Sequence, residues 1–420
     1  MDATIPLPLT RTSDLHDARG IPDALANAAR AALDPSGLGA PPPHLPLIPE
    51  TTRRRHAVFV PADHRFKAAA RFLQALWRED RDLPIGAHID RANPHRVRRL
   101  GSRISIAAGR TGANFMTPNI AAVVARALAY REPGAAYDVG RLRTNLLSSQ
   151  PLAFNLFGSL AADPVLATRF MAELFPGALA EVTDILFEHS PGRGDPRFTG
   201  DRTAFDVVIR GTTPTGARAL ICIEMKYSEA GHEAAPPPHP RHMEIGHKTP
   251  GLFVAPDDPT LIGPACQQHY RQHCLASAML TAGLADTATL AFIAPAHNHL
   301  AHTAASTYTR HLMEPAAGPI PFIPLTLEHA FTALAAAGLP AHAAALHRRY
   351  TDWWLLDGEL ELAAMAAARA PHDVVQTSAE VPLATPMLAG KVSPSDSRTP
   401  GRTPRRPRRA NATLPAAHAA

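Results

Sequence analysis

Residues 205–209 (FDVVI) and 219–226 (ALICIEMK) are the stretches that decide the fold of this chain. Both are short, rich in Val and Ile and bounded by Gly or Pro, a pattern typical of buried β-strands. The segment between them, TTPTG at 212–216, is typical of a hairpin loop. We therefore expect a hairpin in which Asp206 opens one strand and a Glu-x-Lys sequence closes the next.

Three charged side chains lie at the ends of these strands. Because side chains alternate along a strand, Glu224 and Lys226 fall on one face of the sheet and Met225 on the other. Asp206 can then share one divalent cation with Glu224, with the ammonium group of Lys226 beside it. That arrangement suits metal-assisted hydrolysis of a phosphodiester bond. The alternative is a charge pair at two surface strand ends, which we disfavour because buried charges are costly unless paired or bound to metal.

The spacing and flanking sequence of these residues resemble the PD-(D/E)XK nuclease superfamily. Asp206 and Glu224 are eighteen residues apart, which fits the hairpin of that superfamily, and Phe205 replaces the Pro of its motif. The stretches 145–158 (NLLSSQPLAFNLFG) and 198–206 (FTGDRTAFD) are similar to a branch of bacterial restriction-endonuclease-like proteins. The resemblance runs from about Phe66 to about Ala330 and implies a nuclease core with the order αβββαβ.

The residue types and this resemblance together give each member of the set a role. Asp206 and Glu224 are expected to ligate Mg²⁺, for which Mn²⁺ is an alternative, with the Met225 carbonyl oxygen as a third ligand. Lys226 is expected to orient or help deprotonate the attacking water and to stabilise charge on the phosphate. The predicted catalytic residues are therefore Asp206, Glu224 and Lys226.

Periodicity along the chain predicts an α/β fold with a mixed central sheet flanked by helices. The order of its elements matches the restriction-endonuclease-like αβββαβ core that the resemblance implies. Strands are predicted at 181–188, 205–209, 219–226, 287–294 and 320–326. Helices are predicted at 64–79, 117–131, 139–150, 163–174, 264–282, 302–313 and 327–350. A Pro- and His-rich exposed loop is predicted at 230–262.

Composition divides the chain into four regions. Residues 1–55 and 371–420 are rich in Pro, Ala, Ser and Arg and lack periodicity, so both are predicted to be disordered. Residues 56–158 are predicted to form a helical N-terminal extension packed on the core. Residues 159–350 are expected, from the resemblance, to form the PD-(D/E)XK nuclease-like core itself.

Two patterns stand out in the N-terminal extension. The helix at 64–79 is amphipathic, with Arg71, Gln74 and Arg78 opposite its apolar face. The stretch 91–110 carries six arginines and no acid. It either contacts a nucleic-acid backbone or forms a solvated arginine-rich surface, and we favour the surface because such clusters are commoner than binding sites.

The net charge of +5 comes from the C-terminus. Segment 391–420 holds seven cationic residues and one Asp, so it contributes +6 and the rest of the chain sums to −1. The run at 402–409 either contacts phosphates nonspecifically or solubilises the chain. The high isoelectric point is therefore no evidence that the folded part binds nucleic acid.

Several features bear on the compartment. The three cysteines form an odd set without disulfide spacing, which favours a reducing compartment. The N-terminus has neither the basic nor the apolar region of a signal peptide. No apolar run reaches the ~18 residues of a membrane span. We expect a soluble, cytoplasmic protein with no membrane partner.

Further side chains are candidates to complete the site. The resemblance allows an acid from the first core helix, which here is Glu173, and a supporting Gln early in the helix after the motif, which here is Gln267 or Gln268. Other acids nearby are Glu188, Asp201 and Glu229. Each acid is individually expected to be structural, because its position in the motif does not fix it.

Three other groupings favour structural roles. The residues Cys266, His269, His273 and Cys274 are of the types that bind zinc. Their cysteines lie two helical turns apart, however, and no second cluster of ligands lies nearby in the sequence. The histidines at 297, 299 and 302 are expected to form a polar loop. The region 145–158 lacks the Gly-x-Ser-x-Gly elbow that Ser148 or Ser149 would need as a nucleophile. Its polar residues, Asn145, Gln150 and Asn155, either contact substrate or support the sheet.

The sequence thus predicts a metal-dependent nuclease whose partner is nucleic acid. We expect that nucleic acid to be DNA. RNA remains compatible with these residues, as do both endo- and exonucleolytic cleavage. The alternative from another class is a catalytically silent module on a nuclease fold that binds nucleic acid or protein. The near-neutral folded part favours that alternative, whereas the intact set of Asp206, Glu224 and Lys226 favours the enzyme.

Overall fold

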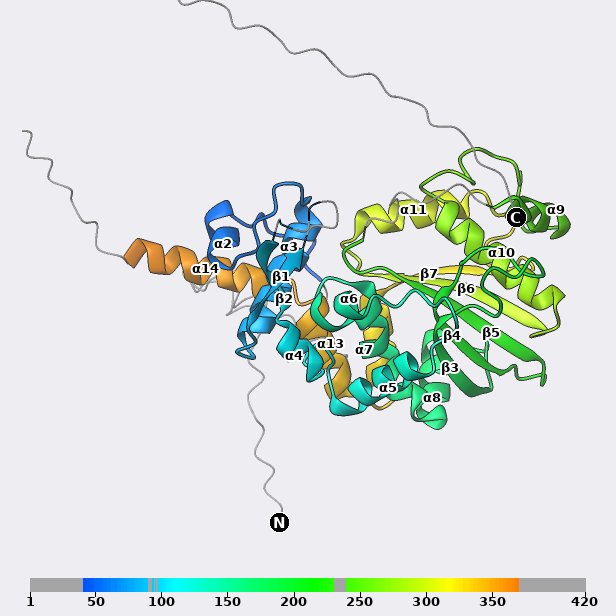
Figure 1. The fold of residues 1–420 in the computed structure, drawn as a ribbon, viewed down its shortest axis with the longest axis horizontal. Helices are drawn as coiled ribbons and strands as arrows, with labels where there is room; N and C mark the ends of the chain where they lie inside the picture. Colours follow the sequence, from blue (N-terminus) through cyan, green and yellow to red (C-terminus); the bar gives the residue numbers. More distant parts are fainter. Residues whose placement is uncertain (1–40, 90–92, 94, 96, 230–238, 370–420) are drawn as a thin grey trace, which may run out of the picture. The chain divides into compact units, whose positions relative to one another are not determined.

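The computed structural model describes residues 41–369 apart from 90–92, 94, 96 and 230–238. The described residues all belong to one compact unit (Figure 1). Within them, no helix is both long and apolar enough to cross a bilayer. Most of the segments predicted to be disordered, 1–40 and 371–420, lie outside the described residues.

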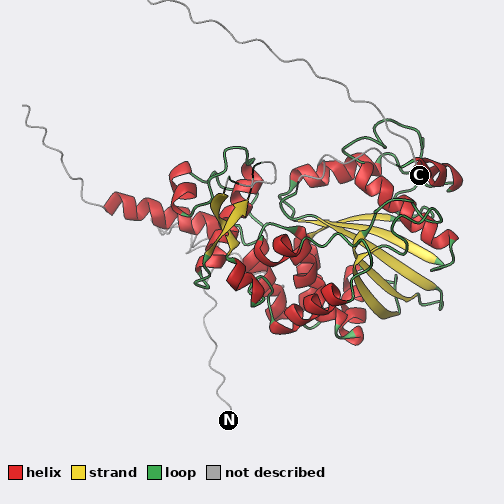
Figure 2. Cartoon of the chain, in the orientation of Figure 1, coloured by secondary structure: helices red, strands yellow, loops and turns green. Residues whose placement is uncertain are grey.

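A five-stranded mixed sheet forms the centre, as expected (Figure 2). The spatial order of the strands follows the chain, and the first three are antiparallel whereas the last two run parallel to the third. The strands are β3 (Glu181–His189), β4 (Phe205–Thr212), β5 (Arg218–Met225), β6 (Thr287–Ala294) and β7 (Phe322–Thr326). The near-continuous apolar sequence of the central strands reflects burial on both faces of the sheet.

Helices cover both faces of this sheet. One face packs against α7 (Ser149–Ala161), α8 (Pro164–Leu174) and α12 (Leu327–Ala336), and α13 (Pro340–Tyr350) packs on α12. The other packs against α10 (Gln267–Thr281) and α11 (His299–Thr309), and α9 (Pro240–Lys248) packs on α10. From α8 to β6 the chain follows the predicted order αβββαβ, with α9 as an additional helix between β5 and α10.

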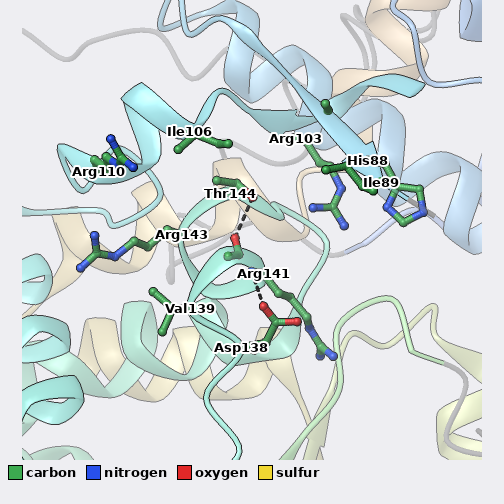
Figure 3. A pocket seen from close by; sticks show the side chains of 12 residues that line it. His88, Ile89, Arg103, Ile106, Arg110, Asp138, Val139, Arg141, Arg143 and Thr144 are labelled. Carbon is green, nitrogen blue, oxygen red and sulfur yellow. Dashed lines mark hydrogen bonds between the residues drawn. The ribbon is translucent and has the colours of Figure 1, made fainter. Parts of the chain in front are cut away.

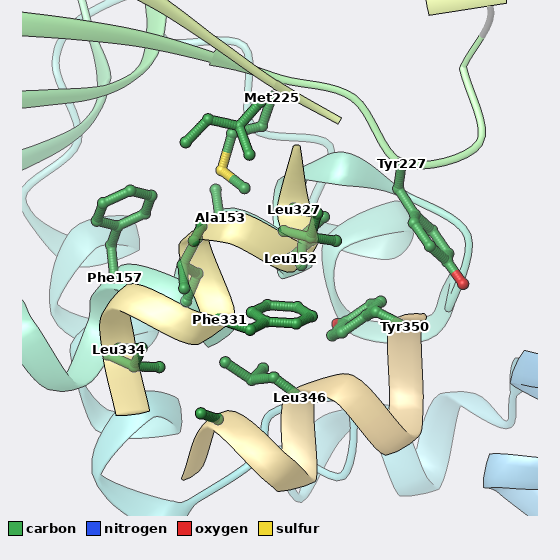
Figure 4. Close-up of a cluster of buried hydrophobic side chains, with 14 of the residues drawn as sticks. Leu152, Ala153, Phe157, Met225, Tyr227, Leu327, Phe331, Leu334, Leu346 and Tyr350 are labelled. Atoms are coloured by element: carbon green, nitrogen blue, oxygen red, sulfur yellow. The ribbon is translucent and has the colours of Figure 1, made fainter. Parts of the chain in front are cut away.

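Side-chain alternation in the hairpin of β4 and β5 separates two cores. Val207 and Ile223 enter the core beneath α7, α8, α12 and α13, whereas Val208 and Cys222 enter the core beneath α10. Figure 4 shows the first core, with Met225 above side chains of α7, α12 and α13. The register is therefore fixed by burial on both faces, because a slip of one residue would exchange the two sets.

The N-terminal extension contributes helices and one strand pair. Its elements are α2 (Glu50–Arg55), α3 (Arg65–Glu79), β1 (Ile85–Ile89), β2 (Val97–Ile104), α4 (Ile106–Arg110), α5 (Pro118–Ala129) and α6 (Val139–Thr144), and a final helix, α14 (Trp354–Arg369), contacts α3. The antiparallel pair β1–β2 was not predicted. Strand β2 lies within the arginine-rich stretch 91–110, and β1 lies just before it.

Two expectations for this extension are wrong. Residues 41–55, predicted to be disordered, are ordered: Leu45 and Ile48 are 6% and 3% exposed in the main core, and α2 follows. The face of α3 expected to be polar and exposed is also buried, because Arg71, Gln74 and Arg78 find partners inside the protein.

Three element boundaries also differ from expectation. The helix predicted at 139–150 is two helices, because Ser148 caps a new helix at α7. The helix predicted at 327–350 breaks where Gly338 adopts φ +106° and Pro340 begins α13. The predicted loop 230–262 contains α9, while its first part, 230–238, lies outside the described residues.

Candidate active site

The hairpin brings the two predicted acids to one edge of the sheet. Its strands are antiparallel, so Asp206 at the start of β4 and Glu224 at the end of β5 lie at the same edge. Both share the sheet face of Val208 and Cys222, which α10 covers. Asp206 is partly exposed and Glu224 is buried.

Lys226 follows β5 directly and contacts Glu224. Its Nζ lies 2.8 Å from Oε1 of Glu224. The backbone N–H of Met225 donates to Oδ2 of Asp206 at 2.8 Å, while the Met225 side chain is buried in the opposite core. The structure thus brings the three predicted residues together with the alternation that the sequence implied.

Two glutamines of α10 hold the Glu224 carboxylate. Gln268 Nε2 donates to Oε1 and Gln272 Nε2 donates to Oε2, each at 2.5 Å. The two lie on one helix face because they are four residues apart. Gln267, the other predicted candidate, instead accepts from Arg271 at 3.3 Å. Gln272 was not predicted, although its spacing from Gln268 was a usable signal.

Glu188 of β3 completes a set of three carboxylates. It lies between the pairs Phe187–Val207 and His189–Phe205, and is therefore opposite Asp206 in the register. Its φ of +49° lies in the left-handed region, which is unfavourable for a residue with a side chain. Gln150 Nε2 of α7 donates to its Oε1 at 2.6 Å.

Burial and crowding shift the protonation equilibria of these groups. The pKa of Asp206 is raised well above its usual range, first by burial and then by the charges of Glu224 and Glu188. Burial is also the main cause that raises the pKa of Glu188, and repulsion by Glu224 adds to it. Burial would lower the pKa of Lys226, but attraction by the surrounding carboxylates, Glu224 first, outweighs it and raises that pKa. Lys226 is therefore an ammonium group among carboxylates that repel one another.

A cavity of about 250 Å³ opens onto this set. The carboxylates of Glu188, Asp206 and Glu224 line it, together with both glutamines of α10. Three guanidinium groups also line it, those of Arg193, Arg202 and Arg271. The cavity therefore offers carboxylate oxygens to a cation and cationic groups to an anion.

The other predicted acids lie elsewhere. Glu173 is exposed on α8. Asp201 accepts hydrogen bonds from Thr199 and Thr203, which fix the turn before β4. Glu229 accepts from Arg141, from the N–H and hydroxyl of Ser149, and from the Tyr227 N–H, so it fastens the segment after Lys226 to α6 and α7.

The Cys and His set of α10 has structural partners. His273 accepts from the Tyr308 hydroxyl and donates to the Ile320 carbonyl, and the Cys274 thiol lies 3.4 Å from the His242 carbonyl oxygen. Among the residues that the structure describes, no group of three or more His, Cys, Asp and Glu side chains is placed to hold a metal ion by itself.

The remaining polar candidates also act within the fold. Ser148 caps α7 and accepts from Arg141 Nε at 2.7 Å. Asn155, fully buried, accepts from the Met116 N–H and donates to the Tyr350 hydroxyl. Asn145 accepts from the N–H of Leu147, and His302 contacts the Pro295 carbonyl. Of the polar side chains predicted in 145–158, Gln150 alone bonds a carboxylate of the cavity.

Comparison with known sequences now identifies the family. The sequence profile of the PD-(D/E)XK nuclease superfamily matches residues 61–352, a range that includes the sheet and every residue of the cavity. A search of curated proteins and a search of solved structures find no match. The chain belongs to the PD-(D/E)XK nuclease superfamily, whose members are generally hydrolases that cut nucleic acid.

Proposed function

We propose that this protein is a Mg²⁺-dependent nuclease that hydrolyses phosphodiester bonds of DNA, with Asp206, Glu224 and Lys226 as its catalytic residues. One observation carries the proposal. In a chain of this superfamily, Asp206 and Glu224 line a single cavity, Lys226 contacts Glu224 beside it, and the Met225 N–H supports Asp206. The three free cysteines are all buried, which is compatible with a reducing cytoplasm.

The residues of the cavity fit a hard divalent cation. Burial and the charges of Glu224 and Glu188 raise the pKa of Asp206, which shows the cost of keeping that group ionised without a bound cation. Asp206 and Glu224, with the Met225 carbonyl oxygen, would hold the ion, and water would fill the remaining positions, as Mg²⁺ usually retains several waters. When bound, such a cation polarises the phosphoryl group and lowers the pKa of a bound water.

The chain's own residues supply orientation and charge. Lys226 places an ammonium group beside Glu224, where it can bind a phosphate oxygen and stabilise the negative charge that develops on it. Gln268 and Gln272 fix both oxygens of Glu224. Glu188 adds a third negative charge next to Asp206, which increases the attraction of the cavity for a cation.

The catalytically silent alternative is disfavoured by the same contacts. A binding module without chemistry has no need to bury Glu224 and Lys226 together and to support the carboxylate with two amide groups. Buried charges of this kind are costly, so their retention indicates use.

Cleavage assays test the proposal directly. Purified protein is incubated with plasmid, linear duplex DNA, single-stranded DNA and RNA, with Mg²⁺, with Mn²⁺ and with EDTA. We expect Mg²⁺-dependent cleavage of DNA that EDTA abolishes. Failure to cleave any of these substrates with either metal, by a well-folded protein, would contradict the proposal, and cleavage of RNA alone would reassign the substrate.

A further inference from the structure

A second, larger cavity lies outside the catalytic set, between the β1–β2 pair and α6. Its volume is about 630 Å³. Figure 3 shows Arg103 from β2, Arg110 from α4, and Arg141 and Arg143 from α6 around it. A neighbouring hollow of about 380 Å³ shares Arg103 and Arg141 and adds Lys67, Arg71 and Arg98. We call the two together the arginine groove.

The arginine groove is strongly cationic although the chain outside its C-terminal tail is not. Seven cationic side chains line its two parts against two carboxylates, Asp138 and Glu229. The side chains of Arg103, Arg110 and Arg143 make no hydrogen bond or ion pair with any residue that the structure describes, and the charge of Asp138 only partly offsets that of Arg103. Cations brought together without internal partners repel one another, which is a cost unless they bind an anion. The pKa of Arg103 records that cost, because burial and then the charge of Arg71 lower it.

The groove is connected to the catalytic cavity through the first turn of α7. Ser149 bonds Glu229, which lines the groove, while its neighbour Gln150 bonds Glu188, which lines the catalytic cavity. Ser228, also in the groove, lies two residues after Lys226. An extended polyanion that lies in the groove can therefore continue past one helical turn to the catalytic carboxylates.

We propose that the arginine groove binds the phosphodiester backbone of the nucleic-acid substrate next to the bond that is cut. This inference rests on the proposed nuclease function, and it names the surface that holds the substrate. Guanidinium groups from three separate elements match successive phosphates, because each can bind phosphate oxygens in a bidentate manner. The contacts involve the backbone and not base edges, so they hold and orient substrate without reading its sequence.

Binding in the absence of metal tests the proposal separately from catalysis. Full-length wild type, Arg103→Gln, Arg143→Gln and the double variant are titrated against a short fluorescein-labelled DNA duplex in EDTA, over a series of salt concentrations. Each lost phosphate contact should reduce the slope of log affinity against log salt by about 0.9. At about 0.1 M salt, the variant should therefore bind roughly eightfold more weakly than wild type. Arg169→Gln on α8 is the control, because Arg169 is exposed and lies outside both cavities.

The possible outcomes decide between the two claims. Wild-type affinity and slope in the double variant, or no binding by wild type, would overturn the groove proposal even if the protein cleaves DNA. If the protein never cleaves but the groove variants lose DNA binding, the groove proposal stands and the nuclease proposal is rejected. Parallel titrations with RNA show which nucleic acid supplies the phosphates. If Arg103→Gln fails to melt cooperatively, Arg110→Gln combined with Arg143→Gln replaces it, since Arg110 is exposed.

Discussion

The carboxylate of Glu224 is the point where the polar contacts of the catalytic cavity meet. Lys226, Gln268 and Gln272 all donate to it, and a carboxylate has about four acceptor positions. One position is therefore left for a further partner. Because the carboxylate is buried, each donor that is removed leaves a charge less well compensated.

Replacing Lys226 with Ala should remove cleavage without unfolding the protein. The ammonium group is the charge closest to Glu224, and loss of one electrostatic catalytic group typically costs about 10²–10³-fold in turnover. The two glutamines still satisfy Glu224, so a cooperative melting transition should remain. Lys248→Ala on α9, where the lysine is exposed, is the control and should keep full activity. Wild-type turnover by well-folded Lys226→Ala would exclude this role.

Gln272 and Gln267 offer a matched pair of substitutions on one helix. Gln272→Met should reduce cleavage by roughly 10- to 100-fold, the usual effect of removing a group that orients a metal-binding side chain. Gln267→Met should change cleavage little, because Gln267 bonds Arg271 and not Glu224. Steady-state rates and melting temperatures are compared for both variants. Equal losses in both would mean that the amide of Gln272 does not act through Glu224.

Asp206→Asn tests the cation site through stability. The pKa of Asp206 is raised in the folded protein, so ionisation of this group destabilises the metal-free fold as pH rises above about 4. Replacement by Asn should therefore raise the melting temperature of the metal-free protein at neutral pH. Mg²⁺ should raise the melting temperature of wild type, because it binds only the folded state. It should raise the melting temperature of the variant much less. Calorimetry with and without Mg²⁺ measures both effects, and an equal Mg²⁺ shift in the two proteins would show that Asp206 is not a ligand.

The sequence predicted the members of this site that local geometry fixes. Asp206, Glu224 and Lys226 follow from strand alternation and a hairpin, both of which are short-range patterns. Glu188 and Gln272 do not, because their positions depend on how β3 pairs with β4 and how α10 lies across the sheet. Such contacts join residues far apart in sequence, and no single-segment pattern contains them.

At the scale of elements, the apolar segments were predictable and the polar ones were not. The strands of the central sheet and helices α5, α8 and α10 lie close to their expected positions. The sequence did not predict the β1–β2 pair, because the pair depends on tertiary packing. Gly101 of β2 lies so close to another segment that a Cβ there would be 2.2 Å from the His56 carbonyl oxygen. Gly and Arg are not typical of strands, so the close approach of a neighbouring segment of the same chain explains the pairing.

Helix α10 should make the fold sensitive to acid. Burial first, then the nearby Lys226, lowers the pKa of His269 to about 3, and burial lowers that of His273 to about 4. Both are below the ordinary value of about 6.5, so the unfolded chain binds more protons, and stability is lost as pH falls below 6.5. At about pH 5.5 each histidine should cost about 1.4 kcal/mol.

Substitution separates the contribution of one of these histidines. His269 lies among the rings of Phe292, Tyr308 and Phe322, and its Nδ1 has no hydrogen-bond partner among the described residues. Phe should therefore replace it with little strain. The free energy of unfolding is measured by urea titration at about pH 7.5 and at about pH 5.5. Its decrease between the two pH values should be smaller in His269→Phe than in wild type by about 1.4 kcal/mol. The same drop in both proteins would mean that His269 is protonated in the folded state.

At the scale of the whole molecule, net charge conceals how charge is distributed. Outside 391–420 the chain sums to −1, yet the arginine groove gathers seven cationic side chains against two carboxylates. The stretch 91–110 was interpreted as a solvated surface. Three of its arginines, Arg98, Arg103 and Arg110, line the arginine groove together with residues of α6. Composition could not show this, because α6 lies some forty residues later in the sequence and only the fold places it there.

Removal of 391–420 separates the charge of the tail from that of the groove. This segment contributes +6, and none of the residues assigned to the catalytic cavity or the groove lies in it. Cleavage of short oligonucleotides should therefore stay nearly unchanged, while affinity for long DNA falls and its salt dependence becomes weaker. If tail and groove bind phosphates independently, truncation and Arg143→Gln should reduce the salt slope additively. A truncated protein that melts at a lower temperature would show that the tail supports the fold, and loss of the Arg143→Gln effect after truncation would show that tail and groove bind DNA together.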